Sequence, residues 1–222
     1  KADHIKYGSL TGSGARAKID LKDNILTITD GSVSSCDGQI LFSGLLSPQP
    51  KSYHLASKVR VDKVNISKFL AGFNNFGIRS FTPQSVKGNL FLKTNLKAHL
   101  NPKGELMKNS LNGIVEFDVS NGALVDFGPL KKISKFVPNR DFNNVKLNEL
   151  GAKLNAGGGN INLDFFRVST SVINLDMNGV YSFDTGTNLK IAIPVRNPKD
   201  DYKIKNKTER EQLRYKGTVL RL

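Results

Sequence analysis

The sequence predicts a mainly β protein whose strands form a long antiparallel sheet, with a few short amphipathic helices. Apolar and polar residues alternate with a period of two along most of the chain, which places them on opposite faces of each strand. Two alternating runs exceed ten residues, whereas an ordinary strand has about 5 or 6. The 20 glycines and many asparagines are typical of frequent turns. Such strands favour a sheet with one apolar face and one face in water.

The alternating runs define the strands and their faces. In 89–100, the leucines at 90, 92, 96 and 100 oppose asparagine, lysine and histidine, and in 160–165 three apolar residues oppose asparagine and aspartate. After the run 111–119, Asn121-Gly122 predicts a tight turn into a further strand. The predicted strands are 53–61, 89–100, 111–119, 160–165, 173–183 and 188–196.

Three segments break the alternation and predict helices. The first is NISKFLAGFNNFG, in which Ile66, Phe69, Leu70 and Phe73 recur at i, i+3, i+4 and i+7, the spacing of one side of a helix. The second is GPLKKISKFV, with Pro129 in its first turn. The third is the highly charged KNKTEREQLRYKG.

An internal repeat relates two parts of the chain. The segment 26–44 aligns without a gap to 161–179, at an offset of 135 residues. Each copy continues into a polar turn and another alternating strand, which predicts two related β units, 15–75 and 85–222. The matched pairs are Ile28 with Leu163, Val33 with Val168, Ile40 with Leu175, Phe42 with Met177 and Gly44 with Gly179.

The net charge of +14 favours anionic partners such as phospholipid headgroups, lipopolysaccharide or nucleic acid. The charges are spread along the chain rather than clustered, which favours solubility and protection of strand edges as their role. The single cysteine, Cys36, excludes a disulfide framework and a cysteine-based metal site. No run of 18 apolar residues predicts a membrane-spanning helix. Because the chain begins with Lys and ends in the strand-like GTVLRL, we expect it to be a piece of a longer protein.

Catalytic and metal-binding constellations are not found in the sequence. The three histidines are far apart in sequence and lack ligand-spaced partners. No G-x-S-x-G motif occurs, and AGGGN at 156–160 predicts a glycine hairpin rather than a phosphate loop. Phe91 is a single aromatic among basic strands, not a stacking platform for nucleic acid. We therefore predict no enzyme activity, no cofactor, no metal and no nucleic-acid partner.

Several pieces of the sequence, in this order, carry a family resemblance. They are LKDNILTITDGSVSSCDGQILFSGLL, then KVRVDKVNISKFLAGF, then LNGIVEFDVSNGALVDFGPLKKISKFV, and finally FNNVKLNELGAKLNAGGGNINLDFFRVSTSVINLDMNGVYSFD with IPVRNPKDD. They resemble the AsmA-like family of bacterial cell-envelope proteins, in a form associated with Bacteroidota, and the resemblance covers roughly 16–222. That family is related to the bridge-like lipid transfer proteins.

The resemblance implies a location, a shape and a role. It implies a periplasmic protein held in the inner membrane by an N-terminal helix that is absent from this chain. It implies a β-sheet curled into an apolar, taco-like groove that binds or transfers phospholipid or another acyl lipid. It further implies a part in outer-membrane lipid homeostasis, with envelope proteins as partners, and it offers no catalytic residues.

Combined with the alternation, the resemblance predicts which side chains meet the lipid. The groove lining is expected to be Leu90, Leu92, Leu96, Val115, Phe117, Ile161, Leu163, Phe165, Ile173, Leu175, Met177, Leu189, Ile191 and Ile193. The helices are expected to close one end of the groove or to rest on a membrane through Phe69, Leu70, Phe73, Leu130, Ile133 and Phe136.

A second interpretation remains open from the residues alone. Alternation predicts an apolar face but does not distinguish an open groove from a closed sandwich or barrel. With a filled sandwich core, the chain would be a non-catalytic structural or assembly module that acts through its surface on outer-membrane proteins.

Overall fold

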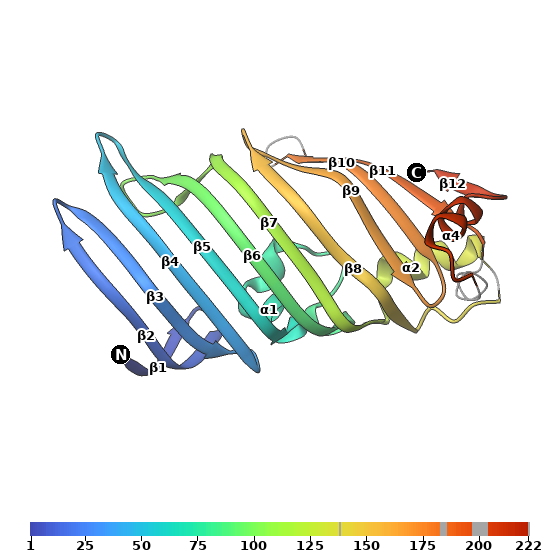
Figure 1. Ribbon diagram of the computed structural model, residues 1–222, viewed down its shortest axis with the longest axis horizontal. Helices are drawn as coiled ribbons and strands as arrows, with labels where there is room; N and C mark the ends of the chain where they lie inside the picture. Colours follow the sequence, from blue (N-terminus) through green and yellow to red (C-terminus); the bar gives the residue numbers. More distant parts are fainter. Residues whose placement is uncertain (138, 183–185, 197–203, 222) are drawn as a thin grey trace.

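The computed structural model describes residues 1–137, 139–182, 186–196 and 204–221. Its strands form one sheet in which each strand pairs with its neighbours in the sequence, and every pairing is antiparallel (Figure 1). The prediction of a mainly β protein built on a long antiparallel sheet is confirmed. In chain order, the twelve strands of the described residues are β1 (Ala2–Tyr7), β2 (Leu10–Lys22), β3 (Ile25–Ser35), β4 (Gly38–Gln49), β5 (Ser52–Asn65), β6 (Val86–Leu100), β7 (Leu106–Val125), β8 (Asn144–Gly157), β9 (Asn160–Thr170), β10 (Asn174–Ser182), β11 (Gly186–Pro194) and β12 (Val219–Arg221).

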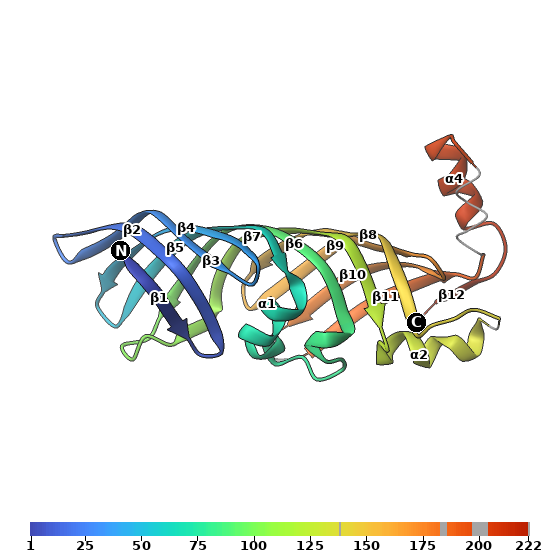
Figure 2. The same cartoon turned by 90° about the horizontal axis from the view of Figure 1, so that it is seen from below.

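The sheet is a single open layer. Strands β1 and β12 form its two edges, and it is neither closed nor strongly curled (Figure 2). The predicted units 15–75 and 85–222 share this sheet, because β5 pairs with β6 from Tyr53↔Leu100 to Asn65↔Asn89. A sandwich needs two facing sheets, and the described strands form only one. The filled sandwich core of the second interpretation is therefore not built by this part of the chain.

The predicted turn at Asn121-Gly122 is wrong. Strand β7 is 20 residues long and continues through this pair without a turn. A two-residue type I′ turn needs positive φ at both central residues, but only Asn121 has it, at 52°. The pair forms an irregularity opposite Gly88, where the register of β6 and β7 shifts. Gly122 lets Leu147 pack closely here, because a Cβ would lie 2.7 Å from Leu147 Cδ1 and 3.0 Å from Leu147 Cβ.

The internal repeat is visible in the strand pairing. In the β3–β4 hairpin, Ile28 pairs with Gly44, and in the β9–β10 hairpin Leu163 pairs with Gly179, at the offset of 135. In both hairpins the first strand then contains one extra residue, a bulge. The next aligned pairs, Gly31↔Phe42 and Phe166↔Met177, again differ by 135 residues. The two hairpins therefore share their register and their bulge, not only their alternation.

The described helices are α1 (Ile66–Gly72), η1 (Asn74–Gly77), η2 (Pro83–Ser85), α2 (Gly128–Ile133), η3 (Ser134–Phe136) and α4 (Lys207–Arg214). Helices α1 and α2 follow β5 and β7 and lie at the end of the sheet where β5 leads into β6 and β7 into β8. Figure 2 shows α1 and α2 on one side of the sheet and α4 on the other. The three predicted helices are thus present. Asn65 caps α1 by accepting a hydrogen bond from the Lys68 amide at 3.2 Å.

The core lies between this end of the sheet and helices α1 and α2. Phe69 and Leu130 point from the helices into it, with 7% and 2% of their surface exposed. Val61, Val145 and Ile193 meet them from the strands and are almost fully buried. The apolar stripes of the helices are therefore used in packing on the sheet.

An open apolar face as the candidate functional site

Charged and apolar side chains lie on opposite faces of the sheet. Cross-strand pairing aligns Arg60, Lys93, Glu116 and Lys153 in one row across β5 to β8. The Lys153 ammonium pairs with the Glu116 carboxylate at 3.1 Å within this row. We call this side of the sheet the polar face, and the arrangement follows directly from the period-two alternation of the strands.

The other side carries rows of apolar and small residues. One row crosses the sheet from β2 to β10 by successive cross-strand pairs. Its members share one line across nine strands and contain no charged side chain. They are Ile19, Ile28, Gly44, Ser57, Leu96, Gly113, Ala156, Ile161 and Tyr181.

The apolar side is covered at one end of the strands and uncovered at the other. Near α1 and α2, Val61 and Ile193 have 1% and 0% of their surface exposed. Toward the opposite hairpin turns the larger side chains become half-buried, while the small Ala98 and Ala156 stay buried at 2% and 8% exposure. At β2, Ile19 and Leu21 reach 68% and 70% exposure. We call this uncovered part, from Ile19 and Leu21 on β2 to Leu189 on β11, the open apolar face.

The structure divides the predicted lining residues into groups. Leu90, Leu175 and Ile193 are buried in the core. Ile173 lies in the turn between β9 and β10 and is fully buried. The remaining apolar-side residues are half-buried on the uncovered part or at its border with the core: Leu92, Leu96, Val115, Phe117, Ile161, Leu163, Met177, Leu189 and Ile191.

Phe165 does not belong to this surface, and its place in the predicted lining needs correction. Leu163 pairs with Gly179, but the next aligned pair is Phe166 with Met177, so β9 contains one extra residue. This bulge reverses the alternation. Phe165 is consequently on the polar face, 55% exposed, with its ring centre 4.9 Å from the Arg167 guanidinium carbon. Phe166, which sequence reasoning missed, takes its place and contacts Phe117 at 6.0 Å between ring centres.

The predicted membrane-contact residues of the helices also divide. Phe69 and Leu130 are buried against the sheet, so they are not available to a membrane. Leu70, Phe73 and Ile133 are partly buried against the core, and only Phe136 is exposed, at 53%.

Sequence reasoning missed two exposed apolar residues beside α1. Phe76 and Ile78 follow the helix and are 59% and 46% exposed. The helical spacing counted only residues up to Phe73, and the second phenylalanine of the GFNNFG segment was the signal that could have identified the extension.

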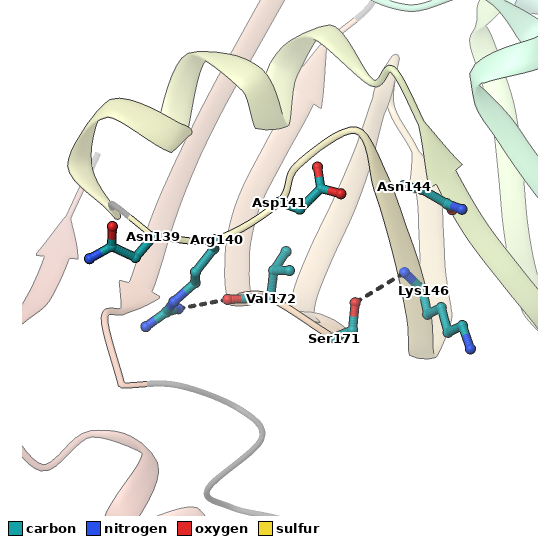
Figure 3. A pocket seen from close by; sticks show the side chains of 7 residues that line it. All are labelled: Asn139, Arg140, Asp141, Asn144, Lys146, Ser171 and Val172. Carbon is teal, nitrogen blue, oxygen red and sulfur yellow. Dashed lines mark hydrogen bonds between the residues drawn. The ribbon is translucent and has the colours of Figure 1, made fainter.

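A polar hollow of about 400 Å³ lies beside α2 (Figure 3). The Arg140 guanidinium donates to the carbonyls of Val172 at 2.6 Å and Val195 at 2.7 Å. The Lys146 amide donates to the Ser171 hydroxyl at 3.2 Å, and the Ser171 amide donates back to the Lys146 carbonyl at 2.9 Å. These contacts join the segment after α2 to the β9–β10 turn and the end of β11, which is a structural role.

Two of the histidines are neighbours in space. His54 and His99 are cross-strand partners with ring centres 5.4 Å apart. The Ser52 hydroxyl lies 3.3 Å from His99 Nδ1. No group of three metal-ligating side chains occurs in the described ranges. No described helix is long and apolar enough to cross a membrane.

Comparison with protein-family models, curated proteins and solved structures finds no match to this chain.

Proposed function

We propose that the chain binds acyl lipids on its open apolar face and serves as a lipid-binding or lipid-transfer module of the bacterial cell envelope. The observation that carries the proposal is the uncharged row from Ile19 to Tyr181, which crosses nine strands and is half-buried or exposed at every member except the buried Ala156. Contiguous exposed apolar surface of this extent is typical of sites for apolar ligands or partners. The resemblance to AsmA-like proteins favours the periplasm as the location and phospholipid as the ligand.

The energetics of the open face suit reversible binding. Burying one methylene contributes about 0.8 kcal/mol, so a fully buried sixteen-carbon chain gains on the order of 10 kcal/mol before ordering costs. A chain that lies against one face keeps its other side in water, which leaves about half of that gain. No polar chemistry is needed, which agrees with a proposal of binding rather than catalysis. A partial gain of this size also permits release, as lipid transfer requires.

A matched pair of substitutions tests the proposal. Leu163→Asp places a carboxylate on the open apolar face. Asn162→Asp places the same charge on the preceding residue, which faces the polar side with its cross-strand partner Asn155. A charge at the wall of an open face reaches water, so both variants should fold. We expect Leu163→Asp to weaken binding of a fluorescent long-chain fatty acid at least tenfold, and Asn162→Asp to change it less than twofold.

A second variant keeps the test decisive if Leu163→Asp fails to fold. Leu21→Asp changes a residue of the same face that is 70% exposed, so its fold should survive and its fatty-acid binding should fall. Native mass spectrometry of the purified parent should in addition show bound lipid. The proposal fails if the parent binds no fatty acid and carries no lipid, or if the variants fold and bind fatty acid as the parent does. In either case the structural or assembly module becomes the better interpretation.

A further inference from the structure

The side of the molecule that carries α1 and α2 exposes aromatic residues that the core does not use. Phe76 and Phe136 are 59% and 53% exposed, and Ile78 is 46% exposed. The segments that carry them lie on the same side of the sheet (Figure 2). The packing of α1 and α2 is already provided by Phe69 and Leu130, so these exposed side chains are available to a partner.

The exposed aromatic beside α1 is held in place. The Phe76 ring stacks on Phe73 with ring centres 5.3 Å apart and planes 13° from parallel. Asn74, Asn75 and Phe76 all have φ near +50°, a conformation that is costly for a bulky residue. The Asn75 side-chain amide donates to the carbonyls of Ile78 at 2.7 Å and Phe81 at 2.9 Å, which supports this loop. The ring of Phe76 is thus presented to solvent by a braced turn.

The two exposed regions belong to one surface. Phe81, after the η1 turn, packs on Phe127, which precedes α2, with ring centres 5.0 Å apart. A Cβ at Gly128 would lie 3.5 Å from the Ser80 carbonyl. The loop after α1 and the start of α2 are therefore in contact, and we call residues 76–81 and 127–136 together the helical surface.

The charge of the helical surface has one sign. Its charged residues are Arg79, Lys131, Lys132 and Lys135, all exposed, and neither segment contains Asp or Glu. The adjacent Asp126 pairs with Lys131 at 2.7 Å. The Lys135 ammonium lies 5.0 Å from the centre of the Phe136 ring, so a cation and an exposed aromatic are side by side. Exposed aromatic rings flanked by lysine and arginine are suited to the interface of an anionic bilayer.

We propose that the helical surface docks the protein on a bilayer that contains anionic phospholipid. Phe76 and Phe136 enter the headgroup region, and Arg79, Lys132 and Lys135 contact the phosphates. This surface is distinct from the open apolar face, so membrane docking and acyl-chain binding can be tested independently. If both hold, docking brings the open apolar face close to a membrane from which lipid can move.

Sedimentation with vesicles tests the docking. The parent should bind vesicles of equal phosphatidylglycerol and phosphatidylcholine at least tenfold more tightly than vesicles of phosphatidylcholine alone, with the preference lost at high salt. The double variant Phe76→Ser/Phe136→Ser should lose at least tenfold in binding to the anionic vesicles. The control Phe165→Ser removes a ring that is 55% exposed on the polar face, and it should change binding less than twofold.

A second pair of variants separates a local surface from overall charge. Lys132→Glu/Lys135→Glu and Lys58→Glu/Lys97→Glu alter the net charge equally, but Lys58 and Lys97 are exposed on the polar face. Only the first pair should weaken vesicle binding at least tenfold. Equal loss from both pairs, no preference for anionic vesicles, or no effect of the phenylalanine substitutions overturns the proposal. Binding of heparin with the same residue dependence, without vesicle binding, would assign the surface to a soluble polyanion instead.

Fatty-acid binding measured on the same variants distinguishes this proposal from the proposed function. The variants of the helical surface should bind the fluorescent fatty acid as the parent does. Leu163→Asp should keep its vesicle binding, so loss of one activity without the other identifies which proposal has failed.

Discussion

Replacing Asp176 by asparagine tests whether the residues of β9 after the bulge, such as Arg167, face the side of the sheet that the structure gives them. Asp176 and Arg167 are cross-strand partners on the polar face and form a two-point ion pair, with Nε–Oδ1 at 2.7 Å and Nη2–Oδ2 at 3.1 Å. Their side chains are only 6% and 17% exposed. Asp176→Asn removes the negative charge but keeps the size of the side chain. The guanidinium is then left largely buried without its carboxylate.

The expected cost follows from burial. Breaking one partner of a buried ion pair costs about 3–5 kcal/mol. Arg167 retains some contact with water and the ring of Phe165 at 4.9 Å, so we expect the lower end, about 3 kcal/mol. In a protein of this size, about 1 kcal/mol shifts the Tm by 2–4 °C, which corresponds to a loss of about 6–12 °C.

Glu116→Gln is the matched control for this prediction. Glu116 and Lys153 are also cross-strand partners on the polar face, but their side chains are 48% and 59% exposed. An exposed pair contributes about 0–1 kcal/mol, so the Tm should change by less than about 4 °C. Thermal unfolding followed by circular dichroism measures both variants. Similar changes in Tm for the two variants would contradict the burial of the Asp176–Arg167 pair and the bulge that orients it.

Two further predictions concern the buried core and the close approach of strands. Ile193→Ala, at a residue with 0% exposure, should lower the free energy of unfolding by about 2–5 kcal/mol, whereas Ile19→Ala, at 68% exposure, should change it by less than about 0.5 kcal/mol in urea denaturation. Gly179→Ala should lower the free energy of unfolding by about 3 kcal/mol or more, because φ is +141° and the new Cβ would lie 2.2 Å from the Asn188 carbonyl oxygen. The control Gly158→Ala, at φ +58° with open space around it, should lower it by about 1 kcal/mol. Equal losses in chemical denaturation would refute the close approach of the strands at Gly179.

Local patterns predicted the strands and helices well because the forces that set them act between near neighbours. The leucines at 90, 92, 96 and 100, which share one side of a strand, identified β6 and its apolar side. The spacing of Ile66, Phe69 and Leu70 identified α1 and the side that packs. The repeat of 26–44 in 161–179 extended to the pairing of the hairpins, since the same alternation and the same irregularity recur.

The errors fall where a residue's place depends on a partner strand. Phe165 was assigned to the apolar side because alternation was continued through a bulge that only the pairing of β9 with β10 reveals. Asn121-Gly122 resembles a hairpin turn, but β7 pairs with β6 on both sides of it and keeps the strand extended. A bulge adds one residue to one strand relative to its neighbour, so neither position can be deduced from a strand considered alone.

The sequence by itself determined that the chain is β-rich, that each strand has an apolar and a charged side, and that two parts of the chain repeat. These properties follow from the period of the side chains along the backbone. Only the tertiary structure decided that the strands form one open layer, that α1 and α2 cover one end of its apolar side, and that the rest lies half-exposed. Alternation predicts which side of a strand is apolar, but contacts between residues distant in the sequence determine what covers that side.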